Sequence, residues 1–210
     1  MQEIQNIYKK IKKDIKIRLM EFKNIWEEGS EEDIFTELVF CLLTPQSRAK
    51  SCWAAVQRLA GKNLLKNGTN TQIEKELAGV RFHHNKARYI VEARKIFLAN
   101  GGFAVREKID HKNICNAREW LVKNVKGLGY KEASHFLRNV GFGKEIAILD
   151  RHILKNLKKY GAVKDVPPTL TKNNYCAIEN RMKAFTKKVN IPLDHLDFIL
   201  WYKEAGEVFK

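Results

Sequence analysis

Apolar residues recur at every third or fourth position along almost the whole of this 210-residue chain. That spacing places them on one face of a helix. The first such stripe runs through Ile4, Ile7, Ile11, Ile15, Leu19, Phe22 and Trp26. Alternation of apolar and polar residues, which is typical of half-buried strands, is nearly absent. The sequence therefore predicts an all-α fold.

Short polar motifs indicate where two of the helices begin. Ser30 followed by Asp33 resembles a capping box, in which two side chains satisfy the first main-chain N–H groups of a helix. Thr71 followed by Glu74 has the same spacing and predicts the start of a short helix. We therefore expect helices to begin at these two points.

Proline and glycine divide the chain. Pro45 disfavours a helical conformation at the residue before it and so ends a helix there. Gly101–Gly102 ends the first half of the chain. We expect residues 1–210 to form one unit with two helical subdomains. The first covers about 30–100, and the second covers about 105–210 with the N-terminal helix packed on it.

The chain is strongly basic. Lys and Arg number 39 against 24 Asp and Glu, which gives a net charge of +15, while 44% of the residues are hydrophobic. This balance favours a nucleic acid as partner, ahead of an anionic membrane surface. No apolar run reaches the roughly 18 residues of a membrane span, and the start MQEIQNIYKK lacks the apolar core of a signal peptide. We expect a monomer in the prokaryotic cytoplasm, associated with the nucleoid.

The potential metal ligands form no recognisable motif. The cysteines are scattered without a Cys-x-x-Cys pair, which argues against a zinc ribbon, and we interpret them as reduced and mostly packing residues. They are Cys41, Cys52, Cys115 and Cys176. His83 and His84 are adjacent, but no third ligand stands at a recognisable spacing, so no side-chain metal site is assigned.

The most informative stretch is VKGLGYKEASHFLRNVGFGKEIAILDRHI, which covers residues 125–153. Two helical patterns are joined there by a short turn that contains Gly127 and Gly129. Glycine permits positive φ, and main-chain amides at the start of the second helix can hold a phosphate. An ordinary turn between helices also favours glycine, so the turn alone does not decide between the two interpretations.

The residues around this turn resemble the helix-hairpin-helix DNA glycosylase superfamily. The resemblance rests on Lys126 to Lys131 and on the segment Leu149–His152, in which Asp150 follows Lys131 by 19 residues. It implies two helical subdomains with a cleft between them, and DNA bound through the hairpin glycines. In this superfamily, a lysine at the position of Lys131 distinguishes members with lyase activity.

The resemblance also assigns chemistry to two residues. A neutral Lys131 amine would attack the sugar C1′ and form a Schiff base, which permits β-elimination of the 3′ phosphate and nicks the strand. The Asp150 carboxylate would stabilise the positive charge that develops as the base leaves. Asp150 also precedes a helical pattern, so it is expected to serve as an N-cap as well.

Within the superfamily the chain resembles the compact type 2 8-oxoguanine DNA glycosylases of archaea and some bacteria. The segments YKEASHFLRNVG, DRHIL and WYKEAGEVFK carry this resemblance, which spans essentially the whole chain. Only Cys176 follows Cys115, so the iron–sulfur cluster of related branches cannot form, and nothing before Ile34 indicates an N-terminal β domain. The resemblance implies excision of 8-oxoguanine from double-stranded DNA without a required cofactor.

The same resemblance points to residues of the base pocket. Phe82 and Trp201 are the candidates to sandwich the flipped base, although each could also be a packing residue. Lys210 matches a lysine that helps this subfamily to tell guanine from its oxidised form. The two bases differ at N7, which is an acceptor in guanine and a donor in 8-oxoguanine. We expect the terminal carboxylate or main chain of Lys210, rather than its ammonium, to accept the N7–H.

Further DNA contacts are expected in two loops. Gln46, in LLTPQSRA, resembles the glutamine that related enzymes insert into the gap left by the flipped base, with Arg48 and Lys50 near phosphate. The carbonyls of Val125 and Leu128 would hold a structural monovalent cation at the hairpin.

Two alternatives remain open from the sequence. A related enzyme could excise oxidised pyrimidines or alkylated purines, because the sequence describes the pocket poorly. A non-catalytic DNA-binding module could carry the same hairpin and the same charge. Lys131 and Asp150 together favour an enzyme, since binding alone requires neither of them.

Overall fold

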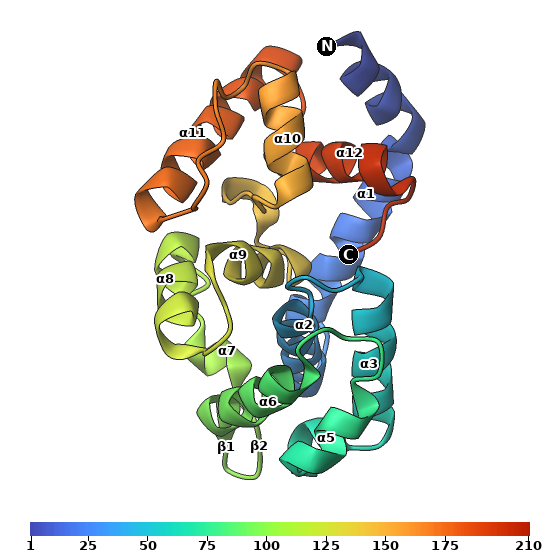
Figure 1. Cartoon of the computed structure of the whole chain (residues 1–210), viewed down its shortest axis with the longest axis vertical. Coiled ribbons are helices and arrows are strands. Elements are labelled where there is room, and N and C mark those ends of the chain that lie inside the picture. Colours follow the sequence, from blue (N-terminus) through green and yellow to red (C-terminus); the bar gives the residue numbers. More distant parts are fainter. The chain divides into compact units, whose positions relative to one another are not determined.

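The computed structural model describes residues 1–210 and consists almost entirely of helices (Figure 1). The α-helices are α1 (Gln2–Glu27), α2 (Glu31–Leu43), α3 (Ala49–Gly61), α4 (Leu64–Asn67), α5 (Asn70–Glu76), α6 (His83–Phe97), α7 (Val105–Lys108), α8 (Ile114–Asn124), α9 (Tyr130–Asn139), α10 (Arg151–Lys159), α11 (Lys172–Val189) and α12 (Leu193–Ala205). A 3-10 turn, η1 (Gly143–Glu145), and two antiparallel strands, β1 (Leu98–Ala99) and β2 (Gly102–Phe103), complete the structure. The predicted all-α class is confirmed, and no helix has the length and apolar character to span a membrane.

The chain divides into two compact units. The terminal unit comprises residues 1–24 and 137–210, and the central unit comprises residues 25–136. The N-terminal helix therefore shares a unit with the C-terminal helices. The hairpin between α8 and α9 lies in the central unit, whereas the sequence grouped it with residues 105–210. Helical periodicity identifies each helix but does not show which helices pack together.

The core of the terminal unit joins α1 to α12. The Phe22 ring of α1 stacks on Phe198 of α12, with centroids 6.3 Å apart and an interplanar angle of 19°. The Arg138 guanidinium lies 4.5 Å from the Phe198 centroid and 5.1 Å from that of Phe22. Its Nη2 is also 3.8 Å from Asp197 Oδ2. A buried cation thus holds two aromatic rings and one carboxylate together.

The segment before α10 is fixed by side chains rather than by a neighbouring strand. The Ala147 N–H donates to Glu179 Oε2 at 2.8 Å, and the Leu149 N–H donates to the Tyr175 hydroxyl at 3.2 Å. The same hydroxyl donates to the Ala147 carbonyl at 2.6 Å. Two buried residues of α11 therefore satisfy this main chain, as buried polar groups require. They fix the residue that follows, Asp150.

Helix α2 starts as predicted. Asp33 N donates to Ser30 Oγ at 3.1 Å, and Ser30 N donates to Asp33 Oδ2 at 2.8 Å, so the capping box is confirmed. The helix ends at Leu43, before Pro45. Its C-terminal half is buried on all sides, which places it at the centre of the central unit.

The predicted start of the short helix is wrong by two residues. Thr69 is the N-cap of α5, and Gln72 closes the capping box, whereas Thr71 lies inside the helix. The residues 69–72 and 71–74 both have the spacing of the motif, and the helix begins at the earlier one. Gly101 was predicted to end the first half of the chain. In the structure, Asn100 and Gly101 form the turn between β1 and β2.

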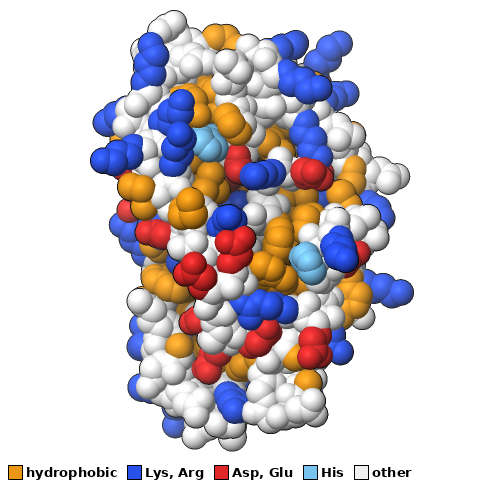
Figure 2. All heavy atoms as spheres, turned by 180° about the vertical axis from the view of Figure 1, so that it is seen from behind, with side chains coloured by type: hydrophobic (Ala, Val, Ile, Leu, Met, Phe, Trp, Pro, Cys, Tyr) orange, Lys and Arg blue, Asp and Glu red, His pale blue; other side chains and the backbone are white.

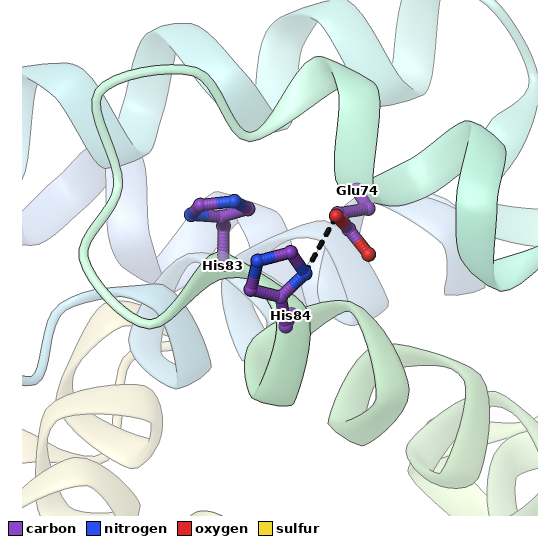
Figure 3. A group of neighbouring side chains, drawn as sticks. All are labelled: Glu74, His83 and His84. Atoms are coloured by element: carbon purple, nitrogen blue, oxygen red, sulfur yellow. Dashed lines mark ion pairs between the residues drawn. The ribbon is translucent and has the colours of Figure 1, made fainter.

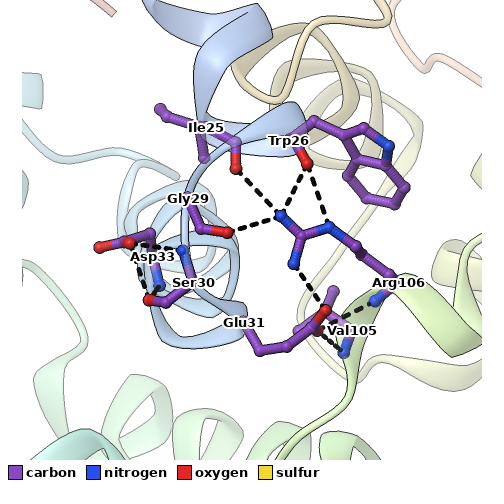
Figure 4. Close-up of polar contacts among 8 residues, drawn as sticks. All are labelled: Ile25, Trp26, Gly29, Ser30, Glu31, Asp33, Val105 and Arg106. Carbon is purple, nitrogen blue, oxygen red and sulfur yellow. Dashed lines mark hydrogen bonds and ion pairs between the residues drawn. The ribbon is translucent and has the colours of Figure 1, made fainter.

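Arg106 of α7 fixes the connection between α1 and α2 (Figure 4). Its Nη2 donates to the carbonyls of Trp26 and Gly29, both at 2.6 Å, and its Nη1 is 2.7 Å from Glu31 Oε1. The other oxygen of Glu31 accepts the Val105 N–H. Charge-assisted hydrogen bonds of this kind are stronger than neutral ones, so they anchor the start of α2.

Candidate active site

The surface carries the excess positive charge that the composition requires. On the face drawn in Figure 2, Lys and Arg side chains are spread widely, with Asp and Glu side chains among them. No single patch on this face stands out as the place where a polyanion would bind. The site must therefore be located from the geometry of particular residues.

The hairpin between α8 and α9 requires glycine at position 127. Gly127 has a φ of 94°, and an added Cβ would lie 2.5 Å from a ring carbon of Tyr89. Both the conformation and the close approach therefore exclude a side chain. Two residues on, the Gly129 N–H donates to Glu132 Oε2 at 3.2 Å, which is one half of a capping box. The sequence analysis predicted that main-chain amides at this helix start could bind a phosphate. The Gly129 amide, however, already donates to an acceptor within the protein.

Lys131 is the second residue of α9 and has a half-buried side chain, which is 23% exposed. Its Nζ lies 3.5 Å from Thr44 Oγ1 and 3.5 Å from Glu132 Oε1. Thr44 belongs to the loop between α2 and α3, so Lys131 reaches from the hairpin to that loop. Both are weak contacts, and they leave the amine able to meet a substrate.

The sequence missed Lys86, although it carried a signal. Lys86 lies one helical turn before Ile90 on the apolar stripe of α6, where a charged residue is unexpected. It is only 3% exposed, and its Nζ donates to the carbonyls of Leu43 and Pro45 at 2.8 and 2.7 Å and to Ser47 Oγ at 3.1 Å. Burial lowers the pKa of Lys86. This ammonium holds the loop between α2 and α3 from inside.

The same loop exposes Gln46 at its tip. Gln46 has a φ of 54°, in the left-handed region that residues other than glycine and asparagine rarely adopt. Its side chain is exposed, and so is that of Arg48, the N-cap of α3. The loop therefore presents both residues to solvent, as a DNA-contacting role would require.

Phe82 is the N-cap of α6 and also has a left-handed conformation, with a φ of 58°. Its side chain is 55% exposed, which is unusual for phenylalanine. Phe82 lines a small open pocket of about 180 Å³. The other lining residues are Leu42, Pro45, Asn85, Lys86, Tyr89 and Gly127. The central unit thus brings the hairpin, the loop after α2 and the start of α6 to one place.

In the terminal unit Asp150 is the N-cap of α10, as predicted. Its Oδ1 accepts the N–H groups of His152 and Ile153 at 2.8 and 2.7 Å. The other oxygen, Oδ2, makes no hydrogen bond in the structure. One oxygen therefore caps the helix, and the other is available for a second purpose.

Trp201 lies in the same part of the terminal unit as Asp150. The His152 ring meets the Trp201 ring edge-on, with centroids 5.5 Å apart, and the His152 N–H is one of the two that Asp150 accepts. His152 Nδ1 is also 3.4 Å from Glu204 Oε2. His152 was not singled out from the sequence, although it belongs to the motif DRHIL.

Lys210 extends back toward α1 within the terminal unit. Its Nζ lies 5.8 Å from the centroid of Phe22, a distance at which a cation interacts with a ring face. The ammonium thus has an intramolecular contact. The central unit carries Lys131, Gln46, Arg48, Phe82 and the hairpin, and the terminal unit carries Asp150, Trp201 and Lys210.

Comparison with known proteins gives matches along the whole chain. The profile of a protein family described as 8-oxoguanine DNA glycosylase matches residues 15–191. The 8-oxoguanine DNA glycosylase/AP lyase of Fusobacterium nucleatum is 48% identical over 209 residues, which are 99% of this chain and 96% of that protein.

Two solved structures are also similar. The 8-oxoguanine glycosylase/lyase of Methanocaldococcus jannaschii, in complex with a 15mer DNA containing 8-oxoguanine, matches with a TM-score of 0.89 and 35% identity over 100% of this chain and 98% of that one. The 8-oxoguanine DNA glycosylase of Thermotoga maritima matches with a TM-score of 0.88 and 33% identity over 100% and 97%.

The Lys86 ammonium generates a prediction about stability. Lys86→Met keeps the length of the side chain but removes the donor from the Leu43 and Pro45 carbonyls. We expect the free energy of unfolding to fall by about 2–4 kcal/mol, because hydrogen bonds from a buried charged group are lost. Urea unfolding measures this. Lys95→Met, at an exposed position of the same helix, is the control and should change it by less than about 0.5 kcal/mol. Equal stability of the two variants would contradict the role given to Lys86.

Proposed function

Because the chain belongs to the 8-oxoguanine DNA glycosylase family, we propose that it excises 8-oxoguanine from double-stranded DNA and then nicks the abasic site. It is thus a bifunctional DNA N-glycosylase and lyase of base excision repair. The observation that carries the proposal is the half-buried Lys131 at the second residue of α9, directly after the hairpin. We expect the enzyme to act as a monomer at the nucleoid.

The proposed reaction begins at the sugar of the flipped nucleotide. The Lys131 amine attacks C1′, and the base leaves with the electron pair of the glycosidic bond and takes up a proton. The positive charge that develops on the sugar is stabilised by the Asp150 carboxylate, whose Oδ2 has no partner in the protein. Displacement of the base leaves an aminal, in which C1′ is bonded to both Lys131 Nζ and the ring oxygen O4′. The C1′–O4′ bond then breaks, O4′ takes up a proton, and the opened sugar is held as a Schiff base between Lys131 Nζ and C1′. Loss of a C2′ proton then expels the 3′ phosphate and nicks the strand.

Recognition of the base is assigned to three residues. Phe82 offers an exposed ring and Trp201 a partly exposed one, so both are suited to stack on a flipped base. Lys210 would accept the N7–H of 8-oxoguanine with its main-chain oxygen. Guanine has an acceptor at N7, so the same contact would repel it.

We assign the contacts with the DNA duplex to the hairpin and to the loop after α2. Gln46 would fill the gap left by the flipped base, and Arg48 would contact phosphate. Gly127 and Gly129 allow the main chain of the hairpin to approach the backbone of DNA closely. The carbonyls of Val125 and Leu128 would hold a monovalent cation there, and no other cofactor is needed for the steps above. The Val125 carbonyl accepts the Leu128 N–H at 3.2 Å and keeps a second lone pair.

The nucleophile can be tested by trapping the Schiff base. Borohydride should link the protein covalently to a duplex that carries 8-oxoguanine, and Lys131→Gln should abolish the adduct because the amine is gone. Lys95→Gln, at an exposed position, is the control and should retain it. Duplexes with an oxidised pyrimidine or an alkylated purine test the other substrates. An adduct that persists in Lys131→Gln would assign the nucleophile to another residue.

Asp150→Asn separates the two roles of Asp150. Asparagine is an equally good N-cap, so the melting temperature should stay close to that of the wild type. The negative charge is lost, however, so single-turnover base removal should slow on the order of 100-fold or more. A rate close to the wild-type value would reduce Asp150 to a helix cap.

Lys210 is tested through its main chain. Deleting Lys210 should lower the preference for 8-oxoguanine over guanine by roughly 5-fold or more, because a hydrogen bond that discriminates the bases is lost. Lys210→Ala retains the main-chain oxygen and should preserve the preference. The measurement is the ratio of excision rates on duplexes that differ only at this base. The reverse pattern would assign recognition to the ammonium.

A further inference from the structure

Three metal-ligating side chains converge between α5 and α6, on the central unit (Figure 3). Glu74 comes from the last turn of α5, and His83 and His84 are the first two residues of α6. His84 Nδ1 is 2.6 Å from Glu74 Oε1, and the two imidazole rings have centroids 4.2 Å apart. One ligand atom from each residue lies within 4.8 Å of the others. The sequence offered no third ligand beside the two histidines, and the fold supplies it from the preceding helix.

We propose that Glu74, His83 and His84 bind a divalent transition-metal ion such as Zn²⁺. Two imidazole nitrogens and one carboxylate oxygen form a ligand set that Zn²⁺ accepts well and that Mg²⁺ and Ca²⁺ do not prefer. All three side chains are at least partly exposed, so the ion enters from solvent and completes its coordination with water.

The distances suit such an ion after the side chains rotate. Zn²⁺ lies about 2.0–2.2 Å from nitrogen and oxygen ligands, so in its preferred tetrahedral geometry two ligand atoms are about 3.4 Å apart. The ligand atoms of the cluster lie within 4.8 Å of one another, so a separation of that size must close by about 1.4 Å. The His84 side chain is 73% exposed, and its ring can turn without disturbing the core.

The cluster contributes one negative charge toward a cation, that of the Glu74 carboxylate. The ion would lie near the N-terminus of α6, where the helix carries a positive partial charge that opposes it. The Glu74 carboxylate supplies negative charge at the same place. Without an ion, Glu74 has only His84 as an oppositely charged partner, and only when that ring is protonated.

The main chain that carries the ligands is well anchored. Helix α5 begins with the capping box of Thr69 and Gln72. Near its end, the Glu76 carbonyl accepts Arg58 Nη2 at 2.6 Å, and the Glu76 carboxylate lies 2.6 Å from Lys62 Nζ. A bound ion would tie this anchored helix to the start of α6 and so clamp residues 77–83. The proposal is independent of the proposed function, because no contact with DNA enters it.

Calorimetric titration of the metal-free, full-length protein with Zn²⁺ tests the site. We expect one equivalent to bind to the wild type. Glu74→Gln and His83→Ala should each weaken binding by at least ~10-fold, because each removes a ligand. Cys115→Ser and His111→Ala remove an exposed thiol and an exposed imidazole outside the cluster, and they should bind as the wild type does. No binding to the wild type, or a loss only in these two controls, would overturn the proposal.

Amide hydrogen exchange provides a second measurement. Saturating Zn²⁺ should slow exchange in residues 77–83 of the wild type and leave it unchanged in His83→Ala. Without metal, Glu74→Gln and His83→Ala should both melt near the wild-type temperature, since the altered side chains are not in the core. His83→Gln replaces His83→Ala if the latter melts early. If saturating Zn²⁺ leaves exchange in residues 77–83 of the wild type unchanged, Glu74, His83 and His84 are not the ligands that hold the ion.

Discussion

A single buried ammonium, that of Lys86, holds the loop between α2 and α3 from inside the central unit. Its three hydrogen bonds reach residues 43, 45 and 47, so they bracket the positions between. Thr44, which Lys131 contacts, and Gln46 at the tip are those intervening residues. A buried cation needs such acceptors, and the bent loop provides carbonyls that a helix would have used itself. The surroundings of the proposed nucleophile therefore depend on this charge.

Helix α6 supports more than this loop. Its Tyr89 ring occupies the space that a Cβ at Gly127 would need, and its N-cap is Phe82. One helix thus positions the loop after α2, the hairpin before α9 and the exposed phenyl ring. Because these parts are far apart in the sequence, a displacement of α6 would disturb all three together. This is a physical reason for proposing that they serve one purpose.

The features that could be predicted from the sequence are the local ones. The Ser30 box and the Asp150 cap involve residues two or three positions apart. The first was expected from its spacing and the second from its place directly before a helical pattern. The prediction that a helix starts at Thr71 was wrong because two overlapping capping-box motifs, at residues 69–72 and 71–74, lie in the same segment. Lys86 was missed because its acceptors lie about 40 positions away and two of the three are main-chain carbonyls, which have no sequence signature. The partners of Ala147 and Leu149 were missed for the same reason. The assignment of Lys131 came from resemblance, since nothing local distinguishes it from the other lysines.

Backbone conformation supports the proposed DNA contacts without reference to any relative. Five residues other than glycine have a positive φ, and three of them are asparagine, which tolerates that region. The remaining two are Gln46 and Phe82. Such conformations cost on the order of 1 kcal/mol or more, and they persist where the surrounding structure imposes them. Both residues are exposed, so neither gains burial in return. Strain at two exposed residues is expected where a side chain must be presented to a ligand. The two positions that carry it are those assigned to the gap in the duplex and to the flipped base.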